Sequence, residues 1–270
     1  MTERSIWNDI NAIDVAGAAA AFRTSGETRY LCIDDFLRAD FARDVAGAYP
    51  AFEEAVGQGK SYSALHESGK VQLTEASRFP APVVRLHQVL SSDAFVQTLV
   101  EITSIGGLLG DPTLRGGGMH LMGPGGRLDV HVDFNAIREA DLFRRLNLLV
   151  FLTPGWEDAW GGRFELWDPA VEERWAAFSP RFNRCVLFAT GEKSFHGVEP
   201  VRCPRGESRR SFAAYYYTRD APAGWSGDAH STVFRHRPGE RWRAILGIPA
   251  DVRRAMWSAA RRARDRFRTR

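Results

Sequence analysis

The sequence predicts one mainly β domain of the sandwich or barrel type, with supporting helices packed around it. Its 270 residues are 44% hydrophobic and 26% charged, which is typical of a globular chain long enough to bury a sizeable core. From about residue 118, short stretches rich in aromatic and β-branched residues alternate with turn signals such as Gly-Pro-Gly-Gly and Thr-Pro-Gly. We therefore expect a single domain over 1–270, with helical support and an opening strand in 1–117, the β core in 118–220, and loops with a basic helix in 221–270.

The first predicted elements are a strand and a helix. The stretch Arg29–Asp34 (RYLCID) has the composition of a strand. Apolar residues then recur at helical spacing from Phe36 until Pro50 ends the helix, and Asp34 or Asp35 is the expected N-cap.

Two more helices are predicted before the β core. Residues 51–80 are polar and lack a clear period, so we expect irregular structure there. Apolar spacing predicts helices over Pro82–Leu90 and Asp93–Thr103, and the pair Ser91-Ser92 supplies the caps of the second helix. The run Gly116-Gly117-Gly118 lacks the strand, lysine and helix start of a phosphate-binding loop, so it predicts a tight turn.

The net charge of +3 is unevenly distributed. Residues 251–270 contain eight arginines and two aspartates, a charge of +6, which leaves −3 for the first 250 residues. Nucleic-acid binding by the whole domain is therefore not expected. The tail also has an apolar stripe at helical spacing from Val252 to Phe267, which we expect to dock on the β core. The alternative is that its arginines meet an anionic partner, such as a carrier protein, a nucleic acid or a membrane surface.

Cysteine usage and hydropathy predict a cytoplasmic protein. The three cysteines lie far apart and form no CxxC pair, which fits a reducing compartment. The sequence contains no apolar run long enough to span a membrane, and the N-terminus has no basic segment followed by an apolar one, as a secretory signal would.

The most informative pattern is His131 and Asp133 in the segment LDVHVDFN. Residues two apart on a strand point to the same face, so this imidazole and this carboxylate can bind one ion. His196, at the start of the predicted strand HGVEPV, is a candidate third ligand from another strand of the same layer. Two histidines and one carboxylate on one side of an ion form the facial triad of non-haem Fe(II) oxygenases. The alternative for each histidine is a hydrogen-bonded position in the core.

Arg209 follows the third candidate ligand by 13 residues, in the segment SRRSFAAYYYT. On an alternating strand, Arg209 and Ser211 share one face and Arg210 takes the other. A guanidinium on the inner face can bind a carboxylate through two hydrogen bonds.

With these pieces in order, the stretch 118–218 resembles the Fe(II)/2-oxoglutarate-dependent dioxygenases, specifically the prolyl 4-hydroxylase-like branch. The matching segments are GPGGRLDVHVD, RLNLLVFLT, WGGRFELWD, FHGVEPV and RRS, and LCIDDFL is similar to that branch's opening strand and support helix. The resemblance implies a double-stranded β-helix (jelly-roll, cupin-like) core. It also implies that His131, Asp133 and His196 hold Fe(II) and that Arg209 binds 2-oxoglutarate.

Further site residues follow from the same resemblance. Relatives that sense hypoxia place a tyrosine hydroxyl near the cosubstrate carboxylate where this chain has Phe151, and we expect Asn147 or Ser211 to supply that hydrogen bond. The candidates for substrate contact are Arg127, Asp129 and His120. For the first two the alternative is a surface ion pair, and for the histidine it is a core position.

The activity implied by the resemblance is hydroxylation of an unactivated C–H bond of a small molecule, an amino acid or a peptidyl residue such as proline. Dioxygen and 2-oxoglutarate would be consumed, with release of succinate and CO2. Two other classes stay open: a catalytically silent jelly-roll that binds a ligand or regulates a partner, and a zinc or iron cupin acting as a hydrolase or isomerase. The cupin class usually has three or four histidine ligands. Succinate formation that depends on both Fe(II) and 2-oxoglutarate separates the three.

Overall fold

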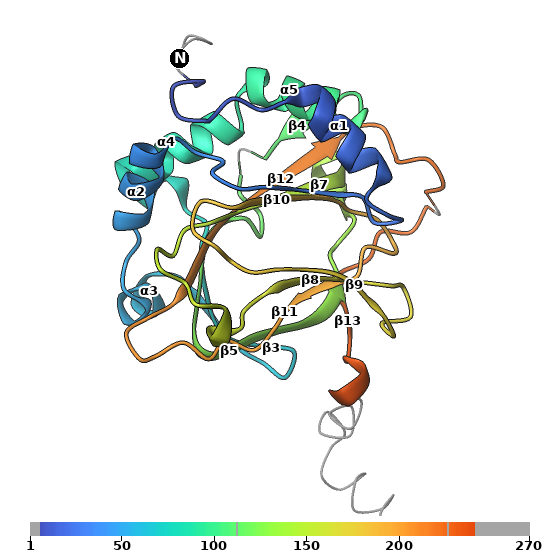
Figure 1. The fold of residues 1–270 in the computed structure, drawn as a ribbon. Coiled ribbons are helices and arrows are strands. Elements are labelled where there is room, and N and C mark those ends of the chain that lie inside the picture. The colour runs from blue at the N-terminus through green and yellow to red at the C-terminus, as the bar shows by residue number, and fades with distance from the viewer. Residues whose placement is uncertain (1–5, 112, 226, 241–270) are drawn as a thin grey trace, which may run out of the picture.

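The computed structural model describes residues 6–111, 113–225 and 227–240 and shows a curled β-sheet with helices on its outer face (Figure 1). The mainly β class that the sequence predicts is confirmed. The helices are α1 (Val15–Thr24), α2 (Ala39–Gly47), α3 (Phe52–Gln58), α4 (Ala81–Leu90) and α5 (Asp93–Thr103). The strands are β1 (Tyr30–Ile33), β2 (Lys60–Ser63), β3 (Glu67–Leu73), β4 (Leu109–Gly110), β5 (Gly118–Val132), β6 (Ala136–Ile137), β7 (Leu142–Phe151), β8 (Phe164–Trp167), β9 (Arg174–Phe178), β10 (Cys185–Ala189), β11 (His196–Val198), β12 (Arg209–Thr218) and β13 (Val233–Arg235).

The strands form one hydrogen-bonded sheet that folds over into two layers. Its main path has the order β1-β10-β7-β12-β5-β11-β8-β9, and β3 pairs with β5 on the same side of the molecule. In Figure 1, β10, β7 and β12 lie in the upper layer, and β8, β9 and β11 lie in the lower layer. Strand β5 belongs to both layers, because its residues 118–122 pair with β12, and Leu128 and His131 pair with β11. The intervening Gly-Pro-Gly-Gly, in which Gly125 has a φ of +78°, lies between these two pairings.

Along residues 146–150 of β7, side chains alternate between the hydrophobic core and the interior of the curled sheet. Leu146, Leu148 and Val150 belong to a buried cluster that also contains apolar side chains of α1, α2, α4 and α5. The residues between them, Asn147 and Leu149, line a cavity on the other face. Figure 1 shows these helices above the upper layer. The helices bury one face of this layer, and the polar residues of its other face line the cavity inside the curled sheet.

Several predicted elements are confirmed, and one boundary is corrected. Strand β1 and helices α4 and α5 lie where the sequence predicts them, and the Ser92 side chain accepts a hydrogen bond from the Phe95 amide as the N-cap of α5. Helix α2 begins at Ala39, later than expected from an aspartate cap at Asp34 or Asp35. The reason is local: Asp35 has a φ of +51°, and the Phe36 amide donates to the Asn183 carbonyl.

The expectation of irregular structure over residues 51–80 was wrong. This segment forms α3 and the hairpin β2–β3, and β3 pairs along β5 from Glu67 to Leu73. The strand pattern was hidden because one face of the hairpin carries polar residues that line the cavity, among them Lys70 and Gln72. An apolar period appears in a strand only when one of its faces meets an apolar layer.

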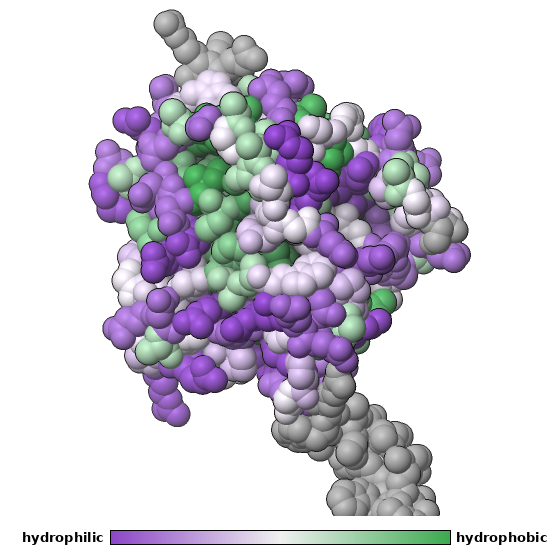
Figure 2. Space-filling model, turned by 45° about the vertical axis from the view of Figure 1, so that its right-hand side comes forward, coloured by the Kyte–Doolittle hydropathy of each residue, from purple (hydrophilic) through white to green (hydrophobic). Residues whose placement is uncertain are grey.

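The C-terminal part adds a strand that the sequence did not predict. Beyond Trp225 we expected loops, but β13 pairs with β5 and places Phe234 opposite His131. The predicted basic helix, with its apolar stripe from Val252 to Phe267, lies outside the described residues. None of the helices within 6–111, 113–225 and 227–240 is long and apolar enough to cross a membrane. Figure 2 shows a largely hydrophilic surface on one face, with apolar residues gathered toward its middle.

Candidate active site

Two adjacent strands bring the three predicted metal ligands together. His131 lies near the end of β5, Asp133 follows that strand, and His196 begins β11 directly opposite His131. The ligand atoms of the three side chains all lie within 4.8 Å of one another. The Nε2 atom of His131 is 3.5 Å from Oδ1 of Asp133, and Nε2 of His196 is 3.3 Å from Oδ2. These residues therefore present two imidazole nitrogens and one carboxylate to a common point.

Backbone carbonyls fix which nitrogen of each imidazole faces that point. Nδ1 of His131 donates to the Asp129 carbonyl at 2.9 Å, and Nδ1 of His196 donates to the Ser194 carbonyl at 2.8 Å. A carbonyl oxygen can only accept, so the proton sits on Nδ1 and the lone pair on Nε2. Burial lowers the pKa of His196, and a neighbouring histidine lowers it further, so this imidazole is neutral. A neutral imidazole oriented by its second nitrogen is the usual form of a metal-binding histidine.

The Asp133 carboxylate is held by two residues of β7. Oδ2 accepts a hydrogen bond from Nδ2 of Asn147 at 2.8 Å and lies 3.0 Å from a terminal nitrogen of Arg144. Nε of Arg144 donates to Oδ1 of Asn147 at 2.8 Å, so each of the three side chains contacts the other two. Burial alone would raise the pKa of Asp133, but the charge of Arg144, together with the contacts to His196 and His131, outweighs it and holds the pKa well below its usual value. The carboxylate is therefore ionised, as metal binding requires.

Arg144 is a site residue that the sequence did not reveal. Its side chain is 1% exposed, and its guanidinium lies 3.5 Å above the ring of Tyr215. Strict alternation on β7 assigns Arg144 to the helix-facing side together with Leu146. The register between β7 and β12 instead shifts between these two residues, and the bulge turns Arg144 toward Asn147.

Arg209 lines the same cavity as the three predicted ligands, and within the described residues it pairs with no counterion. It is 3% exposed, and Nε donates to the Gly162 carbonyl at 2.8 Å while one terminal nitrogen lies 3.4 Å from Oγ of Ser211. Its Nη2 atom has no hydrogen-bond partner within the described residues, and no acidic side chain of those residues pairs with it. Burial lowers the pKa of Arg209 to about 9. A buried guanidinium in this state would be satisfied by a carboxylate entering the cavity.

A glycine turn makes room for this arginine. Gly162, the second glycine of the segment WGG, has a φ of +67°. A Cβ at this position would lie 3.1 Å from Cδ of Arg209 and 3.2 Å from the Trp156 ring. The turn therefore needs glycine both for its backbone conformation and for the approach of the arginine stem.

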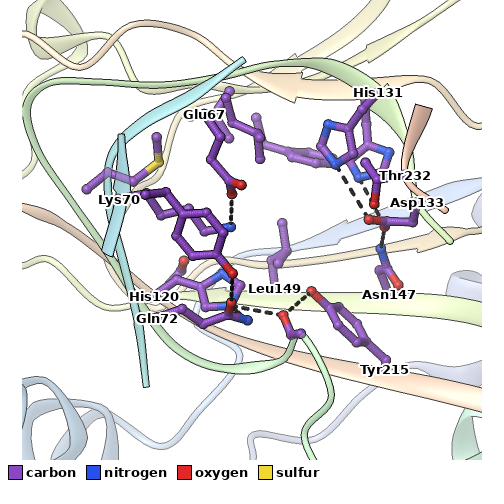
Figure 3. Close-up of a pocket in the computed structure, with 18 of the residues that line it drawn as sticks. Glu67, Lys70, Gln72, His120, His131, Asp133, Asn147, Leu149, Tyr215 and Thr232 are labelled. Carbon is purple, nitrogen blue, oxygen red and sulfur yellow. Dashed lines mark hydrogen bonds and ion pairs between the residues drawn. The ribbon is translucent and has the colours of Figure 1, made fainter. Parts of the chain in front are cut away.

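His131, Asp133 and His196, called the ligand cluster below, line the same cavity as Arg209. The volume of this cavity is about 380 Å³. Figure 3 shows His131, Asp133 and Asn147 on one side and Lys70, Gln72 and His120 on the other. The apolar part of the wall includes Leu149, Phe164 and Phe188. The predicted pocket residue His120 does face this cavity, and burial, followed by the charge of Lys70, lowers its pKa well below the usual value.

The remaining predicted residues divide between the cavity and its surroundings. Ser211 lies beside Arg209, whereas Asn147 contacts Asp133 and Arg144. Arg127 and Asp129 are not among the residues that line the cavity. They form the ion pair that the sequence left open as an alternative, but a buried one, since the Asp129 side chain is 1% exposed. Both belong to a network with His66 and Glu240.

Comparison with known proteins gives the family. Residues 117–217 match the 2OG-Fe(II) oxygenase superfamily, and no curated protein matches the chain at a significant level. A prolyl hydroxylase from Trichoplax adhaerens, solved with a peptide fragment of hypoxia inducible factor, is similar with a TM-score of 0.55 and 17% identity over 75% of this chain and 88% of that one. A prolyl-4-hydroxylase from Pseudomonas putida is similar with a TM-score of 0.50 and 20% identity over 74% of this chain and 98% of that one.

These likenesses confirm the double-stranded β-helix fold that the resemblance implied. The sequence match spans β5 to β12 and thus includes the ligand cluster and Arg209. Residues 117–217 form a 2OG-Fe(II) oxygenase domain, of the superfamily whose members use Fe(II), 2-oxoglutarate and dioxygen.

Proposed function

We propose that the chain hydroxylates an unactivated C–H bond of a small molecule, an amino acid or a peptidyl residue, with 2-oxoglutarate converted to succinate and CO2. In this proposal His131, Asp133 and His196 hold Fe(II), and Arg209 binds the distal carboxylate of 2-oxoglutarate. The observation that carries it is the buried Arg209, whose Nη2 atom has no partner among the described residues and which faces the same cavity as the ligand cluster.

The donor set fits the metal. Two imidazoles that present Nε2 and one ionised carboxylate, on one side of an ion, suit non-haem Fe(II), and they leave other positions open for exogenous ligands. The redox chemistry, in which 2-oxoglutarate is oxidised and one oxygen atom enters the substrate, belongs to the bound iron.

The residues of the chain position the reactants. The Asp129 and Ser194 carbonyls keep both imidazoles in the tautomer that presents Nε2. Arg144 and Asn147 hold one oxygen of the Asp133 carboxylate and so restrict its rotation. Arg209 orients the cosubstrate by its distal end, as a bidentate clamp does.

Apolar side chains close the space around the ligand cluster. Phe188 lies 4.8 Å and Phe164 lies 5.8 Å from the ring of His196, measured between ring centroids. A wall of this kind limits the access of water to the place where the substrate reacts.

The two alternatives are less well supported. A catalytically silent jelly-roll has no need of such a ligand set together with a buried arginine that has no counterion in the described part of the chain. A cupin hydrolase or isomerase usually has three or four histidine ligands, and this cluster has two. A prolyl residue is one candidate substrate. A reducing, cytoplasmic compartment is part of the same proposal, and the three cysteines are free in the structure.

The test is succinate formation by the purified chain. We expect succinate from 2-oxoglutarate only when Fe(II) and dioxygen are both present, and no succinate from the His196→Ala variant. Wild-type succinate formation that continues with Zn(II) in place of Fe(II), or undiminished formation by His196→Ala, would contradict the proposal.

A further inference from the structure

Lysine is rare in this chain, and two of its three lysines face the cavity. Arginine supplies 33 of the 36 basic residues, and the lysines are Lys60, Lys70 and Lys193. Lys60 in β2, which is exposed, and Lys70 in β3, which is half-buried, line the cavity, whereas Lys193 is exposed and lies outside it. A lysine ammonium is a compact charge on a flexible stem, unlike the rigid fork of arginine. Two of the three flexible lysine side chains of this protein therefore lie beside the site.

Strand register puts these lysines at one end of a polar wall and Arg209 at the other. Tyr62 pairs with Lys70, Lys70 with Met122, and Met122 with Arg209, which gives one row across β2, β3, β5 and β12. A second row consists of Lys60, Gln72, His120 and Ser211. Because neighbouring strands are about 4.8 Å apart, the backbones of Lys70 and Arg209 are about 10 Å apart. A cosubstrate held by Arg209 thus leaves the lysine end of the wall to another ligand.

The lysine end has more positive than negative charge. The Nζ atoms of Lys60 and Lys70 lie 4.8 and 5.0 Å from the ring centroid of Tyr62, so both ammonium groups flank one ring. Lys70 pairs with Glu67 at 2.6 Å, and within the described residues Lys60 pairs with no carboxylate. Figure 3 shows Lys70 and Glu67 across the cavity from His131 and Asp133. One carboxylate for two ammonium groups leaves a charge of +1 at this end.

Loading of the cofactor and the cosubstrate does not remove the excess charge. Four cationic and two anionic side chains line the cavity, a net charge of +2 with the histidines neutral. Fe(II) adds two positive charges and 2-oxoglutarate adds two negative ones, so the loaded cavity keeps the same net charge. In a partly buried cavity such an imbalance favours an anionic ligand.

We propose that the substrate of this oxygenase carries a carboxylate group, and that Lys60 and Lys70 bind this group at the end of the wall opposite Arg209. The inference rests on the proposed function. The carboxylate belongs either to a free acidic molecule or to an acidic side chain of a peptide, and the experiment distinguishes these sources.

The test uses the three lysines as reporters. Full-length protein loaded with Fe(II) and saturating 2-oxoglutarate under anaerobic conditions is treated with limiting acetic anhydride, and acetylation of each lysine is measured by mass spectrometry. The probes are N-acetyl-glutamate and the peptide acetyl-Ala-Glu-Ala-amide, each matched with its glutamine counterpart. We expect at least one of the two acidic probes to protect Lys60 and Lys70, with Lys193 as the unprotected internal control. The acidic probe that protects identifies the source of the carboxylate.

Substitutions show whether the charge itself binds the probe. Lys60→Gln should raise the half-protecting concentration measured at Lys70 about tenfold, which is the loss of one charge-assisted hydrogen bond. Lys60→Arg should restore protection because it keeps the charge, and Lys193→Gln should change nothing. Recovery in the arginine variant excludes a simple folding defect.

Three results would overturn the inference: equal protection by the glutamine probes, the same protection by 2-oxoglutarate alone, or no protection by any probe. The proposed function is judged separately, by succinate formation without a probe. The inference about the lysines can therefore be refuted while the proposed function is confirmed, and the reverse is also possible.

Discussion

Replacement of Arg209 by methionine, with Arg210→Met as the matched control, tests the cosubstrate assignment on one strand. Arg209 lines the cavity and has one terminal nitrogen without a partner among the described residues. Arg210 takes the other face of β12, where it contacts Oγ of Ser208 and the Ala46 carbonyl. The two substitutions remove the same group from adjacent positions, and only one of these positions faces the site.

The magnitude follows from the contacts. A hydrogen-bonded pair between a buried guanidinium and a carboxylate contributes about 1.5–3 kcal/mol, so Arg209→Met should weaken 2-oxoglutarate binding by about 10- to 150-fold. The stability of the unliganded protein should stay equal or increase. The buried cation has no counterion within the described residues, and an apolar side chain of similar length avoids its desolvation.

The assay is calorimetric titration of 2-oxoglutarate into Mn(II)-loaded protein, which measures binding without turnover, together with melting curves of the unliganded variants. A dissociation constant of Arg209→Met within a factor of about two of the wild type, well below the range expected for one lost charge-assisted bond, would refute the assignment. A larger loss in Arg210→Met would show that the register of β12 is shifted by one residue.

Three further predictions concern the metal ligand, pH and the tail. Arg144→Leu removes the guanidinium paired with the largely buried Asp133 and leaves that carboxylate without the cation, so the free energy of unfolding should fall by about 3–5 kcal/mol, and Mn(II) should restore part of it in denaturant titrations. Because only the protonated Arg209 binds an anion and its pKa lies at about 9, 2-oxoglutarate affinity should be constant near neutral pH and fall as pH rises through that value, as titrations across this range would show. Deletion of 251–270 should lower the melting temperature and preserve succinate formation; unchanged melting with loss of binding to an anionic partner would contradict the docking expectation.

The ligand cluster could be predicted because its spacing follows directly from strand geometry. His131 and Asp133 are two residues apart on an extended segment, and His196 begins a strand that pairs with the first. The position of Arg209 on the cavity side of β12 could be predicted for the same reason, since alternation separates it from Arg210. Where a strand is regular, every second side chain points to the same face, so the sequence alone predicts which residues face the cavity.

The sequence did not predict site residues where a bulge interrupts the alternation of a strand, or strands whose cavity-facing side chains are polar. Arg144 was missed because a bulge turns it toward the cavity, and nothing in RRLN marks that bulge. The hairpin β2–β3 was missed because it contributes polar side chains, such as Lys70 and Gln72, to the cavity wall. One signal for the hairpin was available, namely that two of only three lysines fall within eleven residues of each other.

The pairing of β1 with β10 has a consequence for synthesis of the chain on the ribosome. Tyr30–Ile33 cannot pair until Cys185–Ala189 has been synthesised. The ion pair between Asp34 and Arg184 likewise joins residues that are 150 positions apart. At about 5–20 residues per second, this delay is about 8–30 s. During that time the first strand is an unpaired edge that a neighbouring nascent chain can join. Folding of this protein should therefore be slow, because its long-range pairings close last, and its yield should depend on how crowded the growing chains are.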